Sequence, residues 1–165
     1  MFREMRRKRQ QMGKEECIRI LDEGASGVLA VHGDDGYPYA VPLNYVYTDE
    51  KIYFHCAKTG HKTEAIEKNE KVSFCVVGMD QNVPEKFTSY FKSVVIFGKA
   101  AVVKDDAEKK TAIEKLAIKY SPDEPKEKRD AAIEREWDQL AVIRVDIEHM
   151  SGKQAIELVA AGDQK

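Results

Sequence analysis

Residues 52–66, IYFHCAKTGHKTEAI, combine side chains that can bind an anion. The segment reads as a strand that ends at 55–57 (HCA), a loop that contains Gly60, and a helix that begins near His61 and Lys62. Cations in the first turn of a helix oppose its macrodipole, and they become favourable when an anion also lies there. The free N–H groups of a helix start, with a lysine and a flexible glycine, form a phosphate-binding site. The alternative is an ordinary loop with two solvated basic side chains.

Motifs for several other chemistries are missing from the sequence. The chain contains no GxxxxGK[ST], GxGxxG or GxSxG pattern, so it lacks the signatures of a P-loop, a dinucleotide fold and a serine hydrolase. The four histidines, His32, His55, His61 and His149, do not have the spacing of zinc ligands, and no metal site is predicted. His55 and Cys56 are neighbours on a strand and point to opposite faces, which makes them a poor pair of base and nucleophile.

The stretch 37–47, YPYAVPLNYVY, alternates along its length. Its odd positions are apolar or aromatic and its even positions are smaller, so a strand here presents one broad apolar face and one shallow face. Because successive N–H groups point to alternate edges, Pro38 and Pro42 remove donors from the same edge. Proline is tolerated there when that edge is open, bulged or turned toward something other than a strand. A bound ligand and a plain sheet edge are the two interpretations.

The remaining sequence supplies short strands and a few helices. Helices are expected over 14–23, 61–69 and 105–120 and around Ile133 and Trp137; strands are expected over 27–33, 37–47, 52–56, 71–77, 93–103 and 140–147, with 79–92 irregular. Gly24 is expected to end the first helix, 34–36 (DDG) is a hairpin turn, and Gly98 predicts a bulge or close approach inside a strand. Six strands joined by short turns favour an antiparallel sheet, closed as a small barrel. The predicted class is α+β, mainly β, in a single domain over 1–165.

The composition excludes several classes of protein. The 165 residues include 27 Lys and Arg against 29 Asp and Glu, a net charge of −2, so bulk attraction to nucleic acid or to an anionic membrane is not expected. No run of about 18 apolar residues exists, which excludes a transmembrane helix. Three cysteines without a CxxC motif indicate a reduced, cytoplasmic protein. The basic arm 1–12 is expected to be solvated and partly frayed, and the tail 153–165 to be flexible.

Taken together, these motifs resemble a known family. The segments MRRKRQ, GVLAVHGDDGYPYAVPLNYVY, IYFHCAKTGHKTEAI, NEKVSFCVVG, PEKFTSYFKSVVIFGKA and AVIRVDIEHMSGK follow one another as in the flavin-binding proteins related to 5-nitroimidazole resistance. That group lies in the pyridoxamine 5′-phosphate oxidase-like split-barrel superfamily, and the resemblance runs from about residue 5 to residue 153. It implies a six-stranded antiparallel split β-barrel with peripheral helices. It also implies a homodimer that binds FMN at the subunit interface, with FAD as the alternative cofactor.

The resemblance further implies a set of binding residues. From one chain these are Pro42, Leu43 and Asn44 along the flavin ring, His55, Cys56 and Ala57 on the same wall, and Gly60, His61 and Lys62 at the phosphate, with Lys62 as the main countercharge. The segment 90–95 of the partner chain would supply Ser93 and Val95, and Trp137 of the partner would cover the flavin. His55 is the candidate catalytic residue, for proton supply or substrate orientation. The alternative is a barrel residue that hydrogen-bonds to a neighbour.

The function implied by this resemblance is an FMN-dependent oxidoreductase that reduces small electron-poor substrates such as 5-nitroimidazoles. Because no nicotinamide motif is evident, a flavin-binding or redox-sensing module without turnover is an alternative. A haem-handling split barrel, with His149 or His55 as axial ligand, is a third reading. No Arg-rich pocket for a phosphorylated vitamer is evident, so oxidation of pyridoxine phosphate is not expected.

Overall fold

One antiparallel sheet organises the molecule. The structure is a computed structural model and describes residues 1–162. Its strands are β1 (Gln11–Met12), β2 (Gly27–His32), β3 (Pro38–Leu43), β4 (Val46–Thr48), β5 (Lys51–Ala57), β6 (Lys71–Val83), β7 (Thr88–Val102) and β8 (Leu140–Gln154). The order across the sheet is β3-β2-β6-β7-β8-β5-β4, and β1 pairs with the last part of β8. Each of these pairings is antiparallel.

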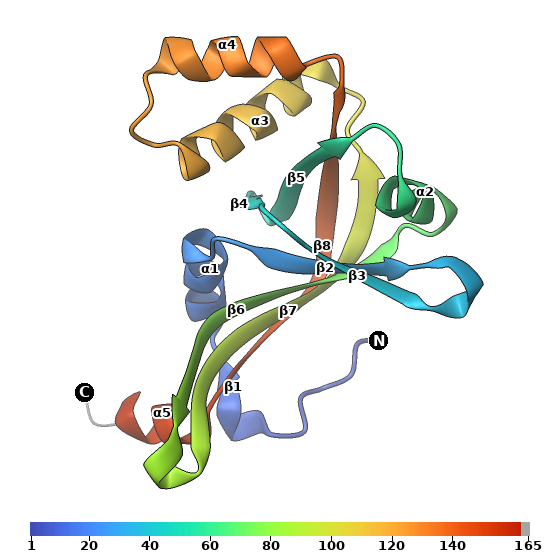
Figure 1. Ribbon diagram of the computed structural model, residues 1–165. Helices are drawn as coiled ribbons and strands as arrows, with labels where there is room; N and C mark the ends of the chain where they lie inside the picture. The colour runs from blue at the N-terminus through green and yellow to red at the C-terminus, as the bar shows by residue number, and fades with distance from the viewer. Residues whose placement is uncertain (163–165) are drawn as a thin grey trace.

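The sheet coils but does not close. β3 and β4 follow each other in the chain, yet they lie at the two ends of the strand order. In Figure 1, β2 and β3 cross the long strands β6, β7 and β8 at a steep angle. The predicted α+β class with a mainly antiparallel sheet is confirmed. The prediction of six strands in a closed barrel is wrong, because the described residues form an eight-stranded sheet that stays open between its two ends.

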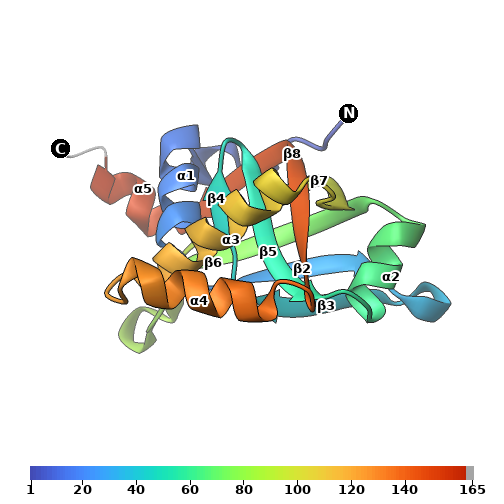
Figure 2. The same cartoon turned by 90° about the horizontal axis from the view of Figure 1, so that it is seen from above.

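Helices flank the sheet and cover its ends. In residues 1–162 they are α1 (Lys14–Glu23), α2 (His61–Lys68), α3 (Asp106–Tyr120), α4 (Lys126–Glu136) and α5 (Ile156–Gly162). α1 buries Cys17, Ile20 and Leu21 against the sheet, and α3 and α4 lie side by side across β5 (Figure 2). None of the helices in this range is both long and apolar enough to cross a membrane.

The core lies on the inner face of the coiled sheet. The largest fully buried side chains are Tyr45, Phe54, Phe74, Leu21, Leu29, Ile52, Ile96 and Ile143. A second, smaller cluster joins α3 to β5 and β8 through Tyr53, Val103, Ala112, Ile113 and Val142. The two clusters together fix the long strands and leave β3 and the second half of β5 at the rim of the sheet.

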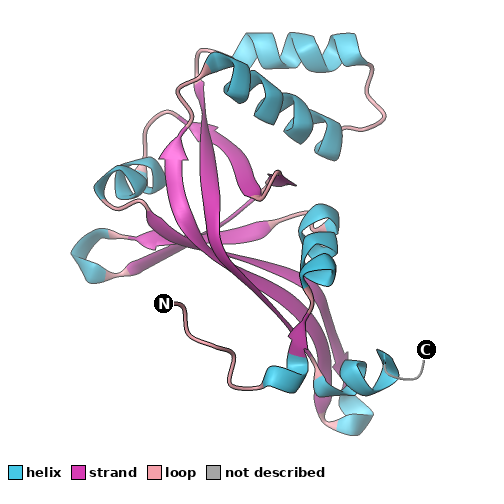
Figure 3. Cartoon of the chain, turned by 180° about the vertical axis from the view of Figure 1, so that it is seen from behind, coloured by secondary structure: helices cyan, strands magenta, loops and turns pink. Residues whose placement is uncertain are grey.

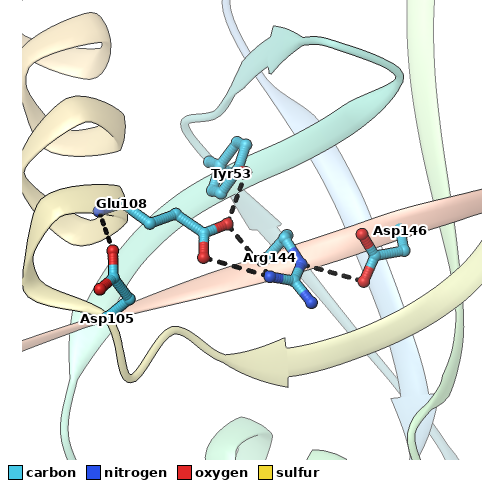
Figure 4. Close-up of polar contacts among 5 residues, drawn as sticks. All are labelled: Tyr53, Asp105, Glu108, Arg144 and Asp146. Carbon is cyan, nitrogen blue, oxygen red and sulfur yellow. Dashed lines mark hydrogen bonds and ion pairs between the residues drawn. The ribbon is translucent and has the colours of Figure 1, made fainter.

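A polar network ties α3 to the sheet (Figure 4). Asp105 caps the helix, because its carboxylate accepts a hydrogen bond from the N–H of Glu108 (2.7 Å). Glu108 in turn accepts from the Tyr53 hydroxyl (2.7 Å) and from Arg144 (3.1 Å and 3.2 Å), and Arg144 also donates to Asp146 (2.9 Å). The hydrogen bonds from Tyr53 and Arg144 lower the pKa of Glu108 below its ordinary value.

Several local predictions are confirmed. The first helix runs over Lys14–Glu23 as expected. The predicted hairpin turn is present, with Asp35 and Gly36 at φ of 54° and 78°. Gly98 lies at a bulge between β7 and β8, where an added Cβ would meet the Asp146 carbonyl oxygen at 2.3 Å. The bulge and the close approach predicted for Gly98 therefore occur together.

The predicted single strand over 37–47 is divided into β3 and β4. The Tyr45 N–H donates to the Tyr120 hydroxyl (2.9 Å), and the Tyr45 hydroxyl donates to the Leu21 carbonyl (2.7 Å). Tyr45 is fully buried. The Tyr45 N–H is thus hydrogen-bonded to a distant side chain instead of a neighbouring strand. The ladder of backbone hydrogen bonds is therefore interrupted at Asn44 and Tyr45.

The predicted irregular segment 79–92 is a second correction. β6 continues to Val83 and β7 begins at Thr88, so the two strands form a long hairpin. Polar residues in this region take part in backbone pairing, with a register shift between Val77 and Met79. The hairpin extends beyond the coiled part of the sheet (Figure 1), and residues 77–82 of β6 are exposed on both faces, a position with which polar side chains are compatible.

Both chain ends contain secondary structure that was not predicted. At the start, Gln10 is buried, donates to the Gln154 carbonyl (2.9 Å), and leads into β1. At the end, β8 continues through Lys153 and Gln154, well past the expected limit at 147, and α5 follows it. The flexibility predicted for the tail 153–165 stays a prediction, and 163–165 lie outside the described residues. The two ends stabilise each other through pairing of β1 with β8.

Candidate functional site

β3 forms an open edge of the sheet. It pairs with β2 alone, and the Gly33 N–H donates to the Tyr37 carbonyl (2.9 Å) across the turn. The odd-numbered residues therefore direct their backbone groups toward β2, and the nitrogens of Pro38 and Pro42 lie on the outer edge. This confirms the open edge that the two prolines predicted. The odd-numbered side chains of Tyr39, Val41 and Leu43 pack against the core.

The second half of β5 forms the other free edge. β4 pairs with β5 only as far as Tyr53, so residues 54–57 have β8 as their single neighbour. His55 and Ala57 are exposed, whereas the Cys56 side chain is buried in the core. This alternation confirms that His55 and Cys56 point to opposite faces. Only the backbone of Cys56 is available to a ligand on the outer face.

The start of α2 presents free backbone donors. Gly60 precedes the helix with φ 135°, a conformation that favours glycine, and no side chain caps the helix. The Thr63 hydroxyl donates to the Gly60 carbonyl (2.7 Å), so it does not accept from the first turn. Within residues 1–162, the N–H groups of His61, Lys62 and Thr63 have no hydrogen-bond acceptor. These donors and the positive end of the helix dipole form an anion-binding position.

The β2–β3 hairpin lies against the start of α2. The rings of Tyr39 and His61 stack with centroids 4.1 Å apart. His61 Nε2 lies 3.6 Å from Asp34 Oδ2, and Lys68 Nζ lies 3.4 Å from Asp34 Oδ1. The open edge of β3, the free half of β5 and the start of α2 are thus neighbours. The sequence identified Asp34 only as a turn residue, because its contacts with α2 are long-range.

Two opposing effects act on the Cys56 thiol. Burial raises its pKa, and the nearby positive charge of Lys62 lowers it to a smaller extent. The net result is a raised pKa, which keeps the thiol protonated at neutral pH and makes it a poor nucleophile. The effect also shows that the Lys62 ammonium lies near the end of β5, although Lys62 belongs to α2.

The break after β3 fixes Asn44. Its side-chain amide donates to the Ala25 carbonyl (2.9 Å), and the residue is exposed. The amide is therefore held in one orientation and its oxygen is left to accept. Pro42 is exposed on the outer face beside it, and Leu43 turns its side chain toward the core.

The remaining predicted binding residues lie elsewhere on the chain. Val95 shares a row across the outer face with Pro42, through Val28 and Cys75. Three strand spacings separate Pro42 from Val95, which is about 14 Å. Ser93 lies further along β7, toward the hairpin. One chain therefore does not bring these two residues to the part of β3 that carries Pro42.

Trp137 ends α4 and packs within its own chain. Its side chain is half-buried against the smaller cluster, and the Lys109 ammonium lies 4.1 Å from its ring centroid. Lys109 also donates to the Trp137 carbonyl (2.9 Å). Shortly after it, Leu140 begins β8 opposite Ala57. The role of Trp137 in covering a partner's flavin stays a prediction.

Two features of the outer face were not identified from the sequence. Exposed apolar side chains lie in and beside the row that holds Pro42 and Val95: Val28 (40 % exposed) is part of the row, and Val77 (61 % exposed) pairs with Ser93 next to it. A separate stack joins Phe2, Phe97 and His149. No sequence pattern marks either feature, because both depend on strand pairing across the sheet. No group of three His, Cys, Asp or Glu side chains within residues 1–162 could hold a metal ion.

The fold and the sequence together place the chain in a family. The family model for pyridoxamine 5′-phosphate oxidase matches residues 13–154, which include every strand from β2 to β8. The chain belongs to this family, as its resemblance to the split-barrel superfamily predicted. A search of the curated proteins found no match.

Solved structures support the same fold. A FAD-binding protein from Mesorhizobium loti is 28 % identical, with a TM-score of 0.64 over 88 % of this chain and 96 % of that chain. A candidate 5-nitroimidazole antibiotic resistance protein from Bacteroides thetaiotaomicron is 22 % identical, with a TM-score of 0.72 over 87 % and 86 %. A FAD and haem binding protein from Mycobacterium smegmatis is 20 % identical, with a TM-score of 0.71 over 93 % and 80 %.

Proposed function

We propose that this protein is a homodimeric flavoprotein that holds FMN against the open edge of β3 and reduces small electron-poor substrates such as 5-nitroimidazoles. The observation that carries the proposal is the placement of the proline-bearing edge of β3 beside the uncapped start of α2. Family membership supports it, and the Mesorhizobium loti neighbour binds FAD. FAD is therefore the alternative flavin.

The residues present fit a flavin in shape. Pro38 and Pro42 prevent another strand from pairing with the outer edge of β3, so a flat ring system can approach it. Pro42, Ala57 and the exposed His55 offer small or flat surfaces on the two sides of the opening. The Asn44 amide, held by Ala25, supplies an oriented polar group beside the ring.

The residues also fit a phosphate in charge. The free N–H groups at the start of α2 and the Lys62 ammonium provide the donors and the countercharge. His61 lies in the same turn and already has a carboxylate partner in Asp34. Lys62 is therefore the side chain on which phosphate binding depends most.

A second copy of the chain would complete the site. Ser93 and Val95 of β7 lie on the outer face of the sheet, which also carries the exposed Val28 of β2 and Val77 of β6. Contiguous exposed apolar surface is typical of protein interfaces. A dimer formed through this face would bring Ser93 and Val95 of one chain toward the edge of β3 of the other.

When bound, the flavin supplies the electron transfer. This chain supplies binding, orientation and proton control. His55 is exposed on the free half of β5 with its side chain on the outer face. In the proposed function it orients the substrate or donates a proton to the reduced group.

A visible spectrum of freshly purified protein, followed by heat release and identification of the chromophore, tests the cofactor. A flavin spectrum with release of FMN supports the proposal. Release of FAD would identify FAD as the cofactor and leave the rest of the proposal unchanged. A strong haem absorbance band would favour the haem-handling alternative. Colourless protein that also fails to bind added FMN and FAD would refute flavin binding.

The phosphate position is tested by the Lys62→Ala variant. We expect the flavin bound per chain to fall, because the main countercharge of the phosphate is removed. Lys104→Ala is the matched control, since Lys104 is an exposed lysine beyond the end of β7. Equal flavin content in the two variants would remove Lys62 from the site.

Anaerobic addition of NADH or NADPH separates an enzyme from a passive module. Fast bleaching of the flavin, followed by reoxidation with a 5-nitroimidazole, is the expected result. A flavin that stays oxidised with both donors would favour the module without turnover. His55→Ala should slow the reoxidation per bound flavin.

The dimer is tested by mass in solution. The chain has a mass of 18.7 kDa, and light scattering should give twice this value. Val77→Glu places a charge on the apolar outer face and should produce monomer, whereas Ile118→Glu, at a site on α3 that is 53 % exposed, should leave the dimer intact. A wild-type monomer that retains flavin tightly would contradict the interface.

A further inference from the structure

The N-terminal arm, residues 1–7, lies along the outside of the sheet without joining it. It leads into the buried Gln10 and β1, which fix its end. In the part of the chain that the structure describes, no backbone hydrogen bond connects residues 1–6 to the sheet. Figure 3 shows the arm leaving β1 and running up beside the sheet. The arm is thus attached at one end by β1 and at the other by side chains.

Phe2 makes the contact at the free end of the arm. Its ring stacks on His149 with centroids 4.7 Å apart and an angle of 10° between the planes, and on Phe97 at 5.8 Å and 18°. Phe97 and His149 are cross-strand partners on β7 and β8. Phe2 remains 43 % exposed. The pair formed by Phe97 and His149 is therefore a fixed surface that accepts a flat aromatic ring, and Phe2 is a ring held there by a loosely attached segment.

A cavity of about 660 Å³ lies beside this stack. Phe2 and Phe97 form part of its wall, and Ala30 and Ser73, which pair with each other across β2 and β6, form part of its floor. Small side chains leave the sheet flat at this place. The volume lies within the range of small-molecule sites, which is about 300–1,000 Å³. The cavity can therefore hold a ring system larger than a phenyl group.

The charged groups that line the cavity favour an acidic ligand. The Lys71 ammonium lines it, with the His32 ring as a further polar group, and Lys71 has no ion-pair partner within residues 1–162. Glu148 is the one carboxylate among the lining residues. The ion pair of the nearby Lys99 is with Glu70 (2.6 Å). An acidic group on a ligand would find Lys71 available.

We propose that this cavity binds a flat aromatic acid, whose ring replaces Phe2 on Phe97 and His149 and whose acidic group faces Lys71 and His32. The arm then acts as an internal competitor that leaves when the ligand enters. None of the predicted flavin-binding residues lines the cavity. The cavity does include Pro38 of the β3 edge, and the titrations below distinguish it from the proposed flavin site and dimer face.

Calorimetric titration of the full chain with 2-naphthoate tests the proposal. The wild-type protein should bind the probe, and Phe2→Ala should bind it about 2- to 12-fold more tightly, since an aromatic pair contributes this factor to an equilibrium. Phe87→Ala is the control for loss of an exposed phenylalanine. Phe87 is 98 % exposed at the tip of the β6–β7 hairpin and does not line the cavity.

Two further variants test separately the surface that binds the ring and the lysine that binds the acidic group. Phe97→Ala removes part of the ring surface and should weaken binding of 2-naphthoate. Lys71→Ala should weaken binding of 2-naphthoate and leave the neutral analogue 2-naphthalenemethanol unchanged. Both residues are exposed, so neither variant should unfold the protein, and thermal unfolding checks this.

The same titration separates this cavity from the proposed flavin site and dimer face. Lys62→Ala and Val77→Glu should bind 2-naphthoate as the wild type does. Loss of binding in either variant would overturn the proposal, because the probe would then occupy the flavin position or a site made by two chains. Failure of Phe2→Ala to tighten binding, or absence of binding in every variant, would also overturn it.

Discussion

Removal of the Glu108 carboxylate should destabilise the protein by detaching α3 from the sheet. Glu108 accepts from the hydroxyl of Tyr53, which is 6 % exposed, and from Arg144. A hydrogen bond to a charged group contributes about 1.5–3 kcal/mol. The ion pair with Arg144 adds at most about 1 kcal/mol, because both side chains stay about a third exposed (30 % and 28 %). For Glu108→Ala we therefore expect a loss of about 2–4 kcal/mol, which corresponds to a melting temperature lower by about 4–16 °C.

Urea unfolding of a double-mutant cycle isolates the contact with Tyr53. Tyr53→Phe should cost about 1.5–3 kcal/mol in the wild type and much less in the Glu108→Ala background, because the partner is already absent. Glu114→Ala on the same helix is the matched control, since Glu114 has no ion-pair partner within residues 1–162. Equal costs of Tyr53→Phe in both backgrounds would refute the reasoning, as would a Glu108→Ala variant as stable as the control.

The contribution of Glu108 should also depend on pH. The folded protein holds its pKa below the ordinary value, so the folded state favours the ionised form. The added stability is present above the pKa of an unfolded glutamate, about 4.3, and is lost as pH falls through the lower folded value. The difference in stability between wild type and Glu108→Gln should therefore shrink on acidification. A difference that grows as pH falls would contradict this assignment.

Three further outcomes follow from the structure. Gly98→Ala should destabilise the protein by about 1–3 kcal/mol in urea unfolding, because the new Cβ would meet the Asp146 carbonyl oxygen at 2.3 Å; wild-type stability would show that the bulge relaxes. Asp105→Ala should lower the free energy of unfolding by about 1 kcal/mol through loss of the helix cap, whereas Asp105→Asn should retain most of the stability that the cap contributes; an equal loss of stability in both variants would count against capping. Native Cys56 should react slowly with iodoacetamide at neutral pH and rapidly after unfolding, because burial raises its pKa; rapid labelling of the folded protein would disprove this.

The sequence determined those elements whose causes are local. The helix over 14–23, the turn at 34–36 and the helix over 105–120 each depend on side chains within a few residues of one another, and all three occur with these bounds or within one residue of them. Proline chemistry is equally local, because a missing N–H excludes a neighbouring strand in any fold. For that reason the open edge of β3 could be predicted, and with it part of the candidate site.

The tertiary structure decided everything that depends on pairing between distant segments. Tyr120 divides the predicted strand at Tyr45 through contacts across 75 residues of chain. Polar residues after Val77 form a hairpin because their backbone groups pair with β7. The polarity of their side chains alone does not predict this pairing. The end of β8 is ordered because β1 pairs with it.

The same division holds for the candidate sites. The composition of 55–62 indicated an anion-binding loop, since a glycine before a helix start and a lysine within it act over one turn. The contact of His61 with Tyr39 and the stack of Phe2 on Phe97 and His149 could not be predicted. Their positions are set by strand register and by the coiling of the sheet, which are properties of the whole chain and leave no pattern in any single segment.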